Sequence, residues 1–219
     1  MGLKKKYDYI IFFDTEFISA KRKKQPIEIS FIAYKINKNE LIYQQTFTTY
    51  IRLQKGVFLN QYVKAFTGIT GEILKDYGIP IHEARLQFID FIAKFGLDNF
   101  ILAGWDITND KVMIDHLLNY EDQTLDVSDF VWYDVSNPYI AFHYKDMPTR
   151  PSLSYACEEC GYNVENYHNS YDDAIATKLV MEKLMNEVGI GVLFQSRFLT
   201  RETNTNKKKA SLEEVKLTK

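Results

Sequence analysis

The feature that most constrains the fold is a short apolar run that ends in two carboxylates. Residues 7–13 read Tyr-Asp-Tyr-Ile-Ile-Phe-Phe, and Asp14-Thr15-Glu16 follows directly. A run so rich in aromatic and β-branched side chains predicts a buried β-strand. Side chains at i and i+2 of an extended chain point to the same face. Asp14 and Glu16 should therefore project together from the end of this strand.

Two neighbouring carboxylates at a strand end have two explanations. Like charges repel, and burial raises the cost, so a divalent cation between Asp14 and Glu16 would account for the pair. Alternatively, the strand ends in polar residues at the surface. Further acids along the chain decide between these two readings.

Composition suits one folded domain and gives no global sign of a partner. The 219 residues are 46% hydrophobic and 15% aromatic, enough for a sizeable core. The net charge of -2 offers no overall attraction to a polyanion, so nucleic-acid binding would depend on local basic patches or metal ions. We see no membrane span and no signal-peptide core, and we expect a cytoplasmic protein.

The two cysteines form a single C-x-x-C, Cys157 to Cys160. One such pair cannot complete a zinc site without histidines, and it lies in a helical pattern without a redox context. We expect a structural pair.

Strand and helix patterns alternate along most of the chain. Three strand-like segments open it, at 7–13, 26–36 and 41–51, and the polar turn between the last two predicts an antiparallel start to a sheet. Helices are then predicted at 70–77, 81–95, 109–118, 153–160 and 171–188, and further strands at 99–105 and 130–134. This order predicts an α/β domain with a mixed sheet and flanking helices. We place the domain at 1–198 and expect the polar stretch 199–219 to be a flexible tail.

Other acids stand at the starts of two predicted helices. Asp106 and Asp110 lie at the junction before the helix at 109–118, and Asp173 lies in the first turn of the last helix, five residues after His168. Singly, each acid is explained by capping, because a carboxylate there accepts free N–H groups and complements the helix dipole. In the last helix the cap itself would be Ser170 or Asp172, as polar residues at its start.

Taken in order, these pieces resemble the DEDDh group of 3′→5′ exonucleases. That family includes the proofreading subunit of the bacterial replicase, RNase T and the histone-mRNA 3′ exonucleases. The resemblance covers roughly residues 9–188 and rests on four motifs, which are Asp14-Thr15-Glu16 after an apolar strand, Glu28-Ile29 at the start of the second strand, Thr67-Gly68-Ile69-Thr70, and His168 followed by Asp173-Ala174. Each motif alone is weak, whereas their shared order is specific.

The resemblance implies an RNase H-like fold and a site for two divalent cations, Mg²⁺ or Mn²⁺. Asp14 would bridge both ions, Glu16 and Asp173 would bind the ion on the nucleophile side, and Asp110 would hold the other. His168 would be the general base, since the ordinary pKa of histidine lies near working pH.

The second motif allows two alignments. The family often has an Asn, then three further residues, and then the catalytic Asp, which puts Asp106 at the Asn position and Asp110 at the catalytic one. Some members instead carry Trp before that Asp, as in Trp105-Asp106. We favour Asp110, because a helix-start acid there turns residues 112–114 into the core. Asp106 stays the alternative.

Several residues near these motifs are candidates for binding the substrate. Apolar or hydroxyl side chains could stack on or wedge the terminal bases, namely Phe17, Ile18, Phe66, Thr67 and Ile69. Packing in the core is the competing explanation for Phe66 and Ile69. The basic run 21–24 and the separate Lys145 and Arg150 could contact phosphates or could simply be solvated.

The leading hypothesis is a metal-dependent 3′→5′ exonuclease that releases nucleoside 5′-monophosphates from single-stranded ends. The alternatives are a catalytically silent domain of the same fold that binds RNA or protein, and an unrelated α/β metal phosphoesterase. Nothing in the sequence chooses RNA over DNA, because no motif reports a 2′-OH contact. A homodimer and a partner in replication or RNA processing also stay open.

Overall fold

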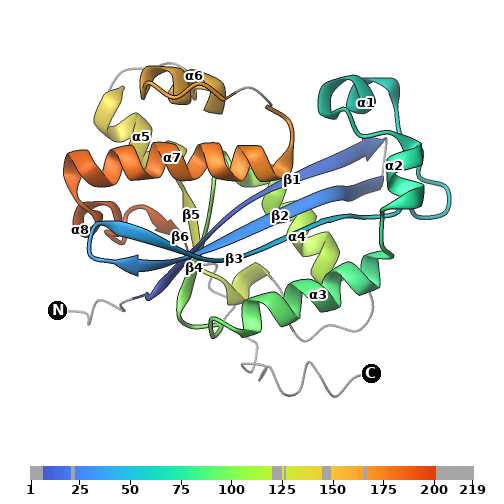
Figure 1. Cartoon of the computed structure of the whole chain (residues 1–219), viewed down its shortest axis with the longest axis horizontal. Coiled ribbons are helices and arrows are strands. Elements are labelled where there is room, and N and C mark those ends of the chain that lie inside the picture. Colours follow the sequence, from blue (N-terminus) through green and yellow to red (C-terminus); the bar gives the residue numbers. More distant parts are fainter. Residues whose placement is uncertain are drawn as a thin grey trace.

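A six-stranded mixed sheet forms the centre of the molecule (Figure 1), in the order β3-β2-β1-β4-β5-β6. The computed structural model describes residues 7–20, 23–119, 125, 127–144, 149–164 and 167–200. The strands are β1 (Tyr9–Ala20), β2 (Lys23–Asn37), β3 (Glu40–Tyr50), β4 (Phe100–Gly104), β5 (Trp132–Asp134) and β6 (Leu199–Thr200). The first three pair antiparallel, and β4 and β5 add parallel strands beside β1. The predicted mixed sheet with an antiparallel start is therefore confirmed.

The strand β1 is longer than the sequence indicated. It runs through Asp14 and Glu16 to Ala20, whereas the apolar run predicted an end near Phe13. Its partner β2 pairs with it along this whole length, with a register shift between Glu16 and Phe17. Pairing between strands does not require apolar side chains, so hydrophobicity reports only the part of β1 that is covered on both faces.

Helices and a 3₁₀ turn connect and cover the strands. They are α1 (Gln61–Thr67), α2 (Gly71–Asp76), α3 (Ile81–Ala93), α4 (Thr108–Leu118), the 3₁₀ helix η1 (Val127–Asp129), α5 (Ser136–His143), α6 (Leu153–Glu159), α7 (Ser170–Val188) and α8 (Ile190–Leu193). The sequence predicted α2, α3, α4, α6 and α7 but missed α1, α5 and α8. α1 buries only Val63, so it carries no periodic apolar face that could announce it.

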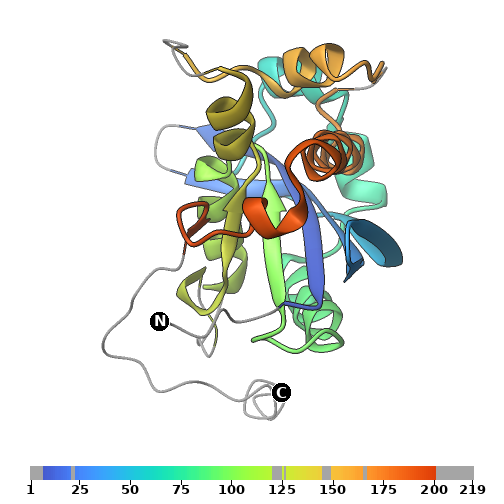
Figure 2. The same ribbon diagram turned by 90° about the vertical axis from the view of Figure 1, so that its left-hand side faces the viewer.

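Side-chain alternation in β1 divides the interior into two cores. Ile11 and Phe13 face α3 and α4, whereas Ile10 and Phe12 face α7 together with α5 and α6. Figure 2 views this arrangement with α7 almost end-on against one side of the sheet. The aromatic load fills both layers, and each face of the sheet is covered by helices.

A third, smaller cluster lies under α1 and α2, beside the far end of β1 (Figure 1). It includes Ile18 and Ile27 from the two paired strands, with Val63 and Ile69 from the segment of α1 and the turn after it. The cluster holds the two short helices against the end of β1 that lies beyond Asp14 and Glu16.

The remaining predictions concern the ends of the chain, the cysteines and a possible membrane span. Leu199 and Thr200, placed in the predicted tail, form β6 and pair with β5, and residues 201–219 lie outside the described part. Cys157 is buried and Cys160 half-buried, both as free thiols. Among the described residues, no helix has the length and apolarity to cross a bilayer.

Candidate active site

The site forms where β1 extends beyond its neighbour β4. The parallel pairing of the two strands ends at Phe12 with Ala103, so the next part of β1 is free on that side. Asp110, in the first turn of α4, takes the vacant position. Its Oδ1 accepts hydrogen bonds from the Thr15 N–H at 3.0 Å and the Thr15 hydroxyl at 2.6 Å. This ties Asp110 to the residue between Asp14 and Glu16.

A glycine permits this close approach of α4 to β1. A Cβ on Gly104 would lie 2.7 Å from Ile107 Cγ2 and 3.1 Å from the Phe13 carbonyl oxygen. Both distances are shorter than ordinary contacts, so a larger residue would push the start of α4 away from β1. The position of Asp110 therefore depends on Gly104.

The fourth acid comes from the start of α7. Asp173 Oδ2 accepts a hydrogen bond from the His168 N–H at 3.1 Å, and His168 has a left-handed backbone with φ of 69°. Glu16, His168 and Asp173 each offer one ligand atom within 4.8 Å of the others. The cap of α7 is Asn169, rather than Ser170 or Asp172, and its side chain accepts the first free N–H groups. Asp173 is thus left free to face the cluster.

A further buried acid, Glu28, lies beside the site and was not predicted to act there. It is the cross-strand partner of Glu16 and is 2% exposed. Its Oε2 accepts a hydrogen bond from the Ser170 N–H at 3.0 Å, and Ser30 Oγ lies 2.8 Å from Ser170 Oγ. These contacts anchor the start of α7 to β2. An antiparallel register drawn between the first two strands would have placed Glu28 beside Glu16.

The crowding of acids perturbs their ionisation. Burial raises the pKa of Asp14 well above its ordinary value, and the charges of Asp110 and Asp173 add to the rise. Burial also raises the pKa of Glu16 to about 9, helped by Asp173 and Glu28. A cluster in which several carboxylates resist ionisation is electrostatically incomplete without positive charge.

The other two acids are shifted less because they accept hydrogen bonds. Burial raises the pKa of Asp110 to about 6, against the lowering effect of the bonds from Thr15. Burial raises that of Asp173 to about 7, against the bond from the His168 N–H. Hydrogen bonds to an ionised carboxylate favour its charged form, which explains the smaller shifts.

The donor set fits divalent cations. All four predicted ligands are carboxylates, the hard oxygen donors that Mg²⁺ and Mn²⁺ prefer. Asp173 Oδ1 is also buried without a hydrogen-bond partner among the described residues. A cation would use that lone pair and offset the repulsion that raises the pKa of Asp14 and Glu16.

Asp106, the alternative second-motif acid, points away from the cluster. Its side chain is 57% exposed and binds Arg150 Nη1 at 2.8 Å, whereas Asp110 is 8% exposed. Arg150 also binds Asp134 Oδ2 at 2.6 Å, so its guanidinium is engaged by two acids rather than open for a phosphate. The geometry favours Asp110. Of the other basic candidates, Lys24 is exposed, and Lys145 and residues 21–22 lie outside the described part.

The predicted substrate contacts divide into core and surface residues. Ile18 and Ile69 are 0% and 3% exposed in the third core cluster, so their side chains cannot wedge a base in this arrangement. The Thr67 hydroxyl donates to the Val63 carbonyl and thereby serves the end of α1. Phe17 is half-buried. Phe66 is 45% exposed and stacks on the His168 ring with centroids 3.5 Å apart.

A hollow of about 400 Å³ opens beside this stack. Its walls come from the end of α1 and the loop before α7, and they are Phe66, Thr67, Gly68, Tyr167, His168, Asn169 and Asp172. The hollow gives His168 direct access to space large enough for part of a substrate.

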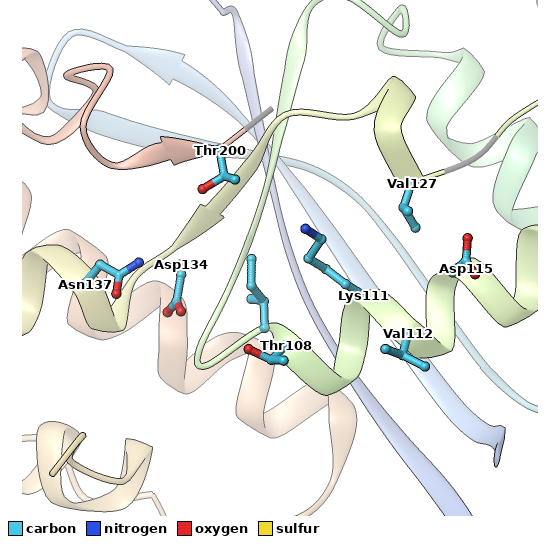
Figure 3. Close-up of a pocket in the computed structure, with 9 residues that line it drawn as sticks. Thr108, Lys111, Val112, Asp115, Val127, Asp134, Asn137 and Thr200 are labelled. Atoms are coloured by element: carbon cyan, nitrogen blue, oxygen red, sulfur yellow. The ribbon is translucent and has the colours of Figure 1, made fainter. Parts of the chain in front are cut away.

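A second hollow, of about 480 Å³, lies on another side of α4 (Figure 3). Lys111 and Asp115 from α4 face it, with Asp134, Asn137 and Thr200 opposite, and Lys111 Nζ lies 5.3 Å from the centroid of the Trp132 ring. None of the five predicted catalytic groups lines it. This hollow is therefore separate from the predicted catalytic groups.

Solved structures with the same fold are nucleases. They include cell-death related nuclease 4 (13% identity, TM-score 0.69, covering 83% of this chain and 65% of that one). The nuclease domain of 3′hExo, a DEDDh family member bound to rAMP, has 19% identity and a TM-score of 0.66. That match covers 83% of this chain and 94% of the 3′hExo domain. E. coli exonuclease I in complex with a dT13 oligonucleotide has 15% identity and a TM-score of 0.65. That match covers 85% of this chain and 42% of exonuclease I. The chain thus spans about two thirds of the first protein and less than half of the third. These likenesses confirm the predicted RNase H-like fold.

A family match covers most of the chain. Residues 11–181 match the model of the RNase T family, described as exonuclease. This stretch contains Asp14, Glu16, Asp110, His168 and Asp173. Among curated proteins no match is found. The chain belongs to the RNase T exonuclease family, as the order of its motifs predicted.

Proposed function

We propose that the protein is a metal-dependent 3′→5′ exonuclease that removes nucleoside 5′-monophosphates from single-stranded RNA or DNA. The observation that carries the proposal is the convergence of Asp14, Glu16, Asp110 and Asp173 from β1, α4 and α7, with His168 next to Asp173. The 3′ polarity is supported by the similar fold of a 3′-exonuclease that recognises the histone mRNA stem-loop.

Asp14, Glu16, Asp110 and Asp173 would hold the divalent cations, which we take to be Mg²⁺ or Mn²⁺. When bound, such cations supply positive charge to the phosphodiester oxygens and make water a better nucleophile. After burial, the charges of Asp110, Asp173 and Glu16 raise the pKa of Asp14, as expected of acids that lie close together. Contacts made by Thr15 and Glu28 hold the segments that carry these acids.

His168 would take the proton from the attacking water. Burial lowers the pKa of His168 below its usual value, which keeps the imidazole neutral and able to accept a proton at pH 7. Its backbone N–H is held by Asp173, and its ring rests on Phe66. The base therefore has two attachments, one on α7 and one on α1.

Two sets of buried hydrogen bonds within the protein would position the acids. The Thr15 hydroxyl and N–H hold Asp110, and Glu28 holds the Ser170 N–H at the start of α7. Displacing a catalytic group by about 1 Å can cost about 100-fold in rate, so these contacts bear on turnover as well as on stability.

The proposal is tested with 5′-labelled single strands of RNA and DNA in Mg²⁺ or Mn²⁺. We expect a ladder that shortens from the 3′ end and that stops when the metal is chelated. Internal cuts would instead indicate a metal phosphoesterase of another type. Binding without any shortening would indicate the silent domain.

A further inference from the structure

The turn that leads from β4 into α4 has an unusual backbone. Asp106 lies at this turn with φ of 49°, in the left-handed region that few residues other than glycine adopt. The helix that follows has Ile107 at its cap position and, among the described residues, no side-chain hydrogen bond to cap it. Asp110, the proposed metal ligand, lies in the first turn of that helix. The position of Asp110 therefore depends on what holds the turn at Asp106.

Hydrogen bonds hold the backbone of Asp106 on both sides. Its N–H donates to Asp134 Oδ1 at 3.1 Å, and its carbonyl oxygen accepts from the N–H of Thr108, the first residue of α4, at 2.8 Å. Asp134 lies at the end of β5, where the N–H and the hydroxyl of Ser136 also donate to its Oδ1. A disfavoured backbone conformation persists only when its surroundings hold it, and these bonds provide part of that support.

Arg150 provides further support through its guanidinium. Nη1 donates to Asp106 Oδ1 at 2.8 Å and to Asp134 Oδ2 at 2.6 Å. Nη2 donates to Asn137 Oδ1 at 3.3 Å. The two acids differ in burial, since the side chain of Asp134 is 10% exposed and that of Asp106 is 57% exposed. The guanidinium thus joins a buried acid at the end of β5 to an acid on the exposed turn.

The segment that carries Arg150 makes a second contact with the same turn. Trp105 Nε1–H donates to the Pro151 carbonyl oxygen at 3.2 Å. The side chain of Arg150 is itself 35% exposed, and ion pairs of such exposed cations add little to the stability of a whole fold. We therefore expect the contacts of Arg150 to act mainly on the local geometry of the turn.

We propose that Arg150 is a positioning residue for the metal ligand Asp110. By joining Asp106 to Asp134, its guanidinium keeps the left-handed turn in place, and this turn sets where α4 begins. The first turn of α4 then brings Asp110 Oδ1 to the N–H and the hydroxyl of Thr15. The inference rests on the proposed function for the role of Asp110 as a ligand. Without Arg150, Asp106 would relax to a negative φ and the start of α4 would shift away from β1.

The test measures metal binding and the position of Asp110 separately from cleavage. In Arg150→Met we expect the apparent Mn²⁺ affinity, measured by electron paramagnetic resonance, to fall by about 10- to 100-fold, as for other residues that orient metal ligands. In the metal-free protein, the Thr15 N–H that donates to Asp110 should exchange faster with solvent, as measured by NMR. Asp110→Ala gives the exchange rate of the released amide. The conservative variant Arg150→Lys keeps a cation between the acids and should bind Mn²⁺ more tightly than Arg150→Met.

A second substitution tests whether Arg150 acts through the backbone turn. Glycine adopts a positive φ freely, whereas alanine resists it. In the Arg150→Met background, Asp106→Gly should raise the Mn²⁺ affinity by about fivefold or more, and Asp106→Ala should not raise it. Recovery with both residues, or with neither, would overturn the proposal. Asp106→Asn does not test the turn, because asparagine tolerates a left-handed backbone and keeps an acceptor for Arg150.

Lys183→Met is the matched control, because it also removes a partly exposed cation from an ion pair, in this case with Glu187 on α7. Equal losses of Mn²⁺ affinity in Lys183→Met and Arg150→Met would overturn the positioning role. Wild-type affinity together with wild-type exchange of the Thr15 N–H in Arg150→Met would overturn it as well.

Two further outcomes keep the inference separate from folding and from activity. If Arg150→Met does not fold, Asp106→Ala decides, because it removes the same contact of Arg150 and disfavours the left-handed turn. Wild-type Mn²⁺ affinity in Asp106→Ala would then overturn the proposal, and a loss would support it. If the wild type shortens no strand while its Mn²⁺ affinity still depends on Arg150, the exonuclease proposal fails and the positioning role stands.

Discussion

The two halves of β1 share one strand and one partner but have opposite surroundings. From Ile10 to Phe13 every side chain is buried among apolar neighbours on one face or the other. From Asp14 to Glu16 the same strand faces three further acids: Asp110, Asp173 and Glu28. Burial of the apolar side chains in the first half stabilises the folded state. This stabilisation offsets the free-energy cost of the crowded carboxylates in the second half. The proposed function is therefore concentrated in the half of β1 where buried carboxylates repel one another.

Removing a charge from the acidic half should have the largest effect. In Asp14→Asn we expect 3′ shortening to fall by about 1,000-fold or more, because losing a metal ligand removes several kcal/mol of transition-state stabilisation. The metal-free protein should melt at a higher temperature than the wild type, since the repulsion from Asp110 and Asp173 is relieved. Activity assays and melting curves measure both. A variant with wild-type turnover would show that Asp14 is no ligand.

Shortening a side chain in the apolar half should lower the stability of the fold and leave turnover largely unchanged. Phe12 is fully buried, so Phe12→Ala should lower the free energy of unfolding by about 3–5 kcal/mol. Turnover per folded molecule should stay near that of the wild type at low temperature. Urea unfolding and active-site titration separate the two quantities. Loss of turnover without loss of stability would contradict this division of β1.

The acidic half should make stability depend on pH in the absence of metal. Folding raises the pKa of Asp110, Asp173 and Glu16 to about 6, 7 and 9, above their unfolded values near 4. The folded state then binds more protons than the unfolded one, so stability is greatest below about pH 4 for these groups and falls as pH rises from about 4 to 9, most steeply where all three groups contribute, between about 4 and 6. Melting temperatures should decline over this range, and Mg²⁺ should reverse the decline. If the melting temperature in the presence of chelator did not change with pH, the carboxylates would not repel one another as inferred.

Two substitutions of Glu28 separate the effect of its charge on stability from the effect of its hydrogen bond. Glu28→Ala leaves the Ser170 N–H without its acceptor and should cost about 1–3 kcal/mol. Glu28→Gln keeps an acceptor and removes a charge next to Glu16, so its stability should equal or exceed that of the wild type. Unfolding curves of the two variants provide the comparison. Similar losses in both would mean that the charge itself is needed.

The smallest effect is expected at Asp106. Asp106→Asn weakens an exposed ion pair with Arg150, worth about 0–1 kcal/mol, and should leave turnover within about twofold. Asp110→Asn, the matched change four residues on, should reduce turnover as severely as Asp14→Asn. Parallel assays of the two variants test the assignment. Inactive Asp106→Asn with active Asp110→Asn would reverse it.

Much of the fold was predictable from local patterns. The apolar run before Asp14, the turn at 37–40 and the Ser152 cap of α6 each depend on residues close in sequence, and the structure has the corresponding elements. The extension of β1 to Ala20 was not predictable in this way, because it depends on pairing with β2 rather than on apolar side chains.

The candidate site shows the same limit. The order of Asp14, Glu16, His168 and Asp173 along the chain was enough to indicate the exonuclease family, because that motif order is a property of sequence. The preference for Asp110 over Asp106 gained structural support only from the hydrogen bonds that Asp110 accepts from Thr15. These two residues are 95 positions apart in the sequence.

The contacts that define the surroundings of the site came from packing alone. Glu28 accepts a hydrogen bond from Ser170, which is 142 residues away in the sequence. Phe66 on α1 stacks on the ring of His168, which precedes α7. Local sequence reports periodicity, caps and turns, since these depend on neighbours in the chain. Cross-strand register and the seating of a helix on a sheet arise when distant segments bury their apolar faces together, so they exist only in the folded molecule.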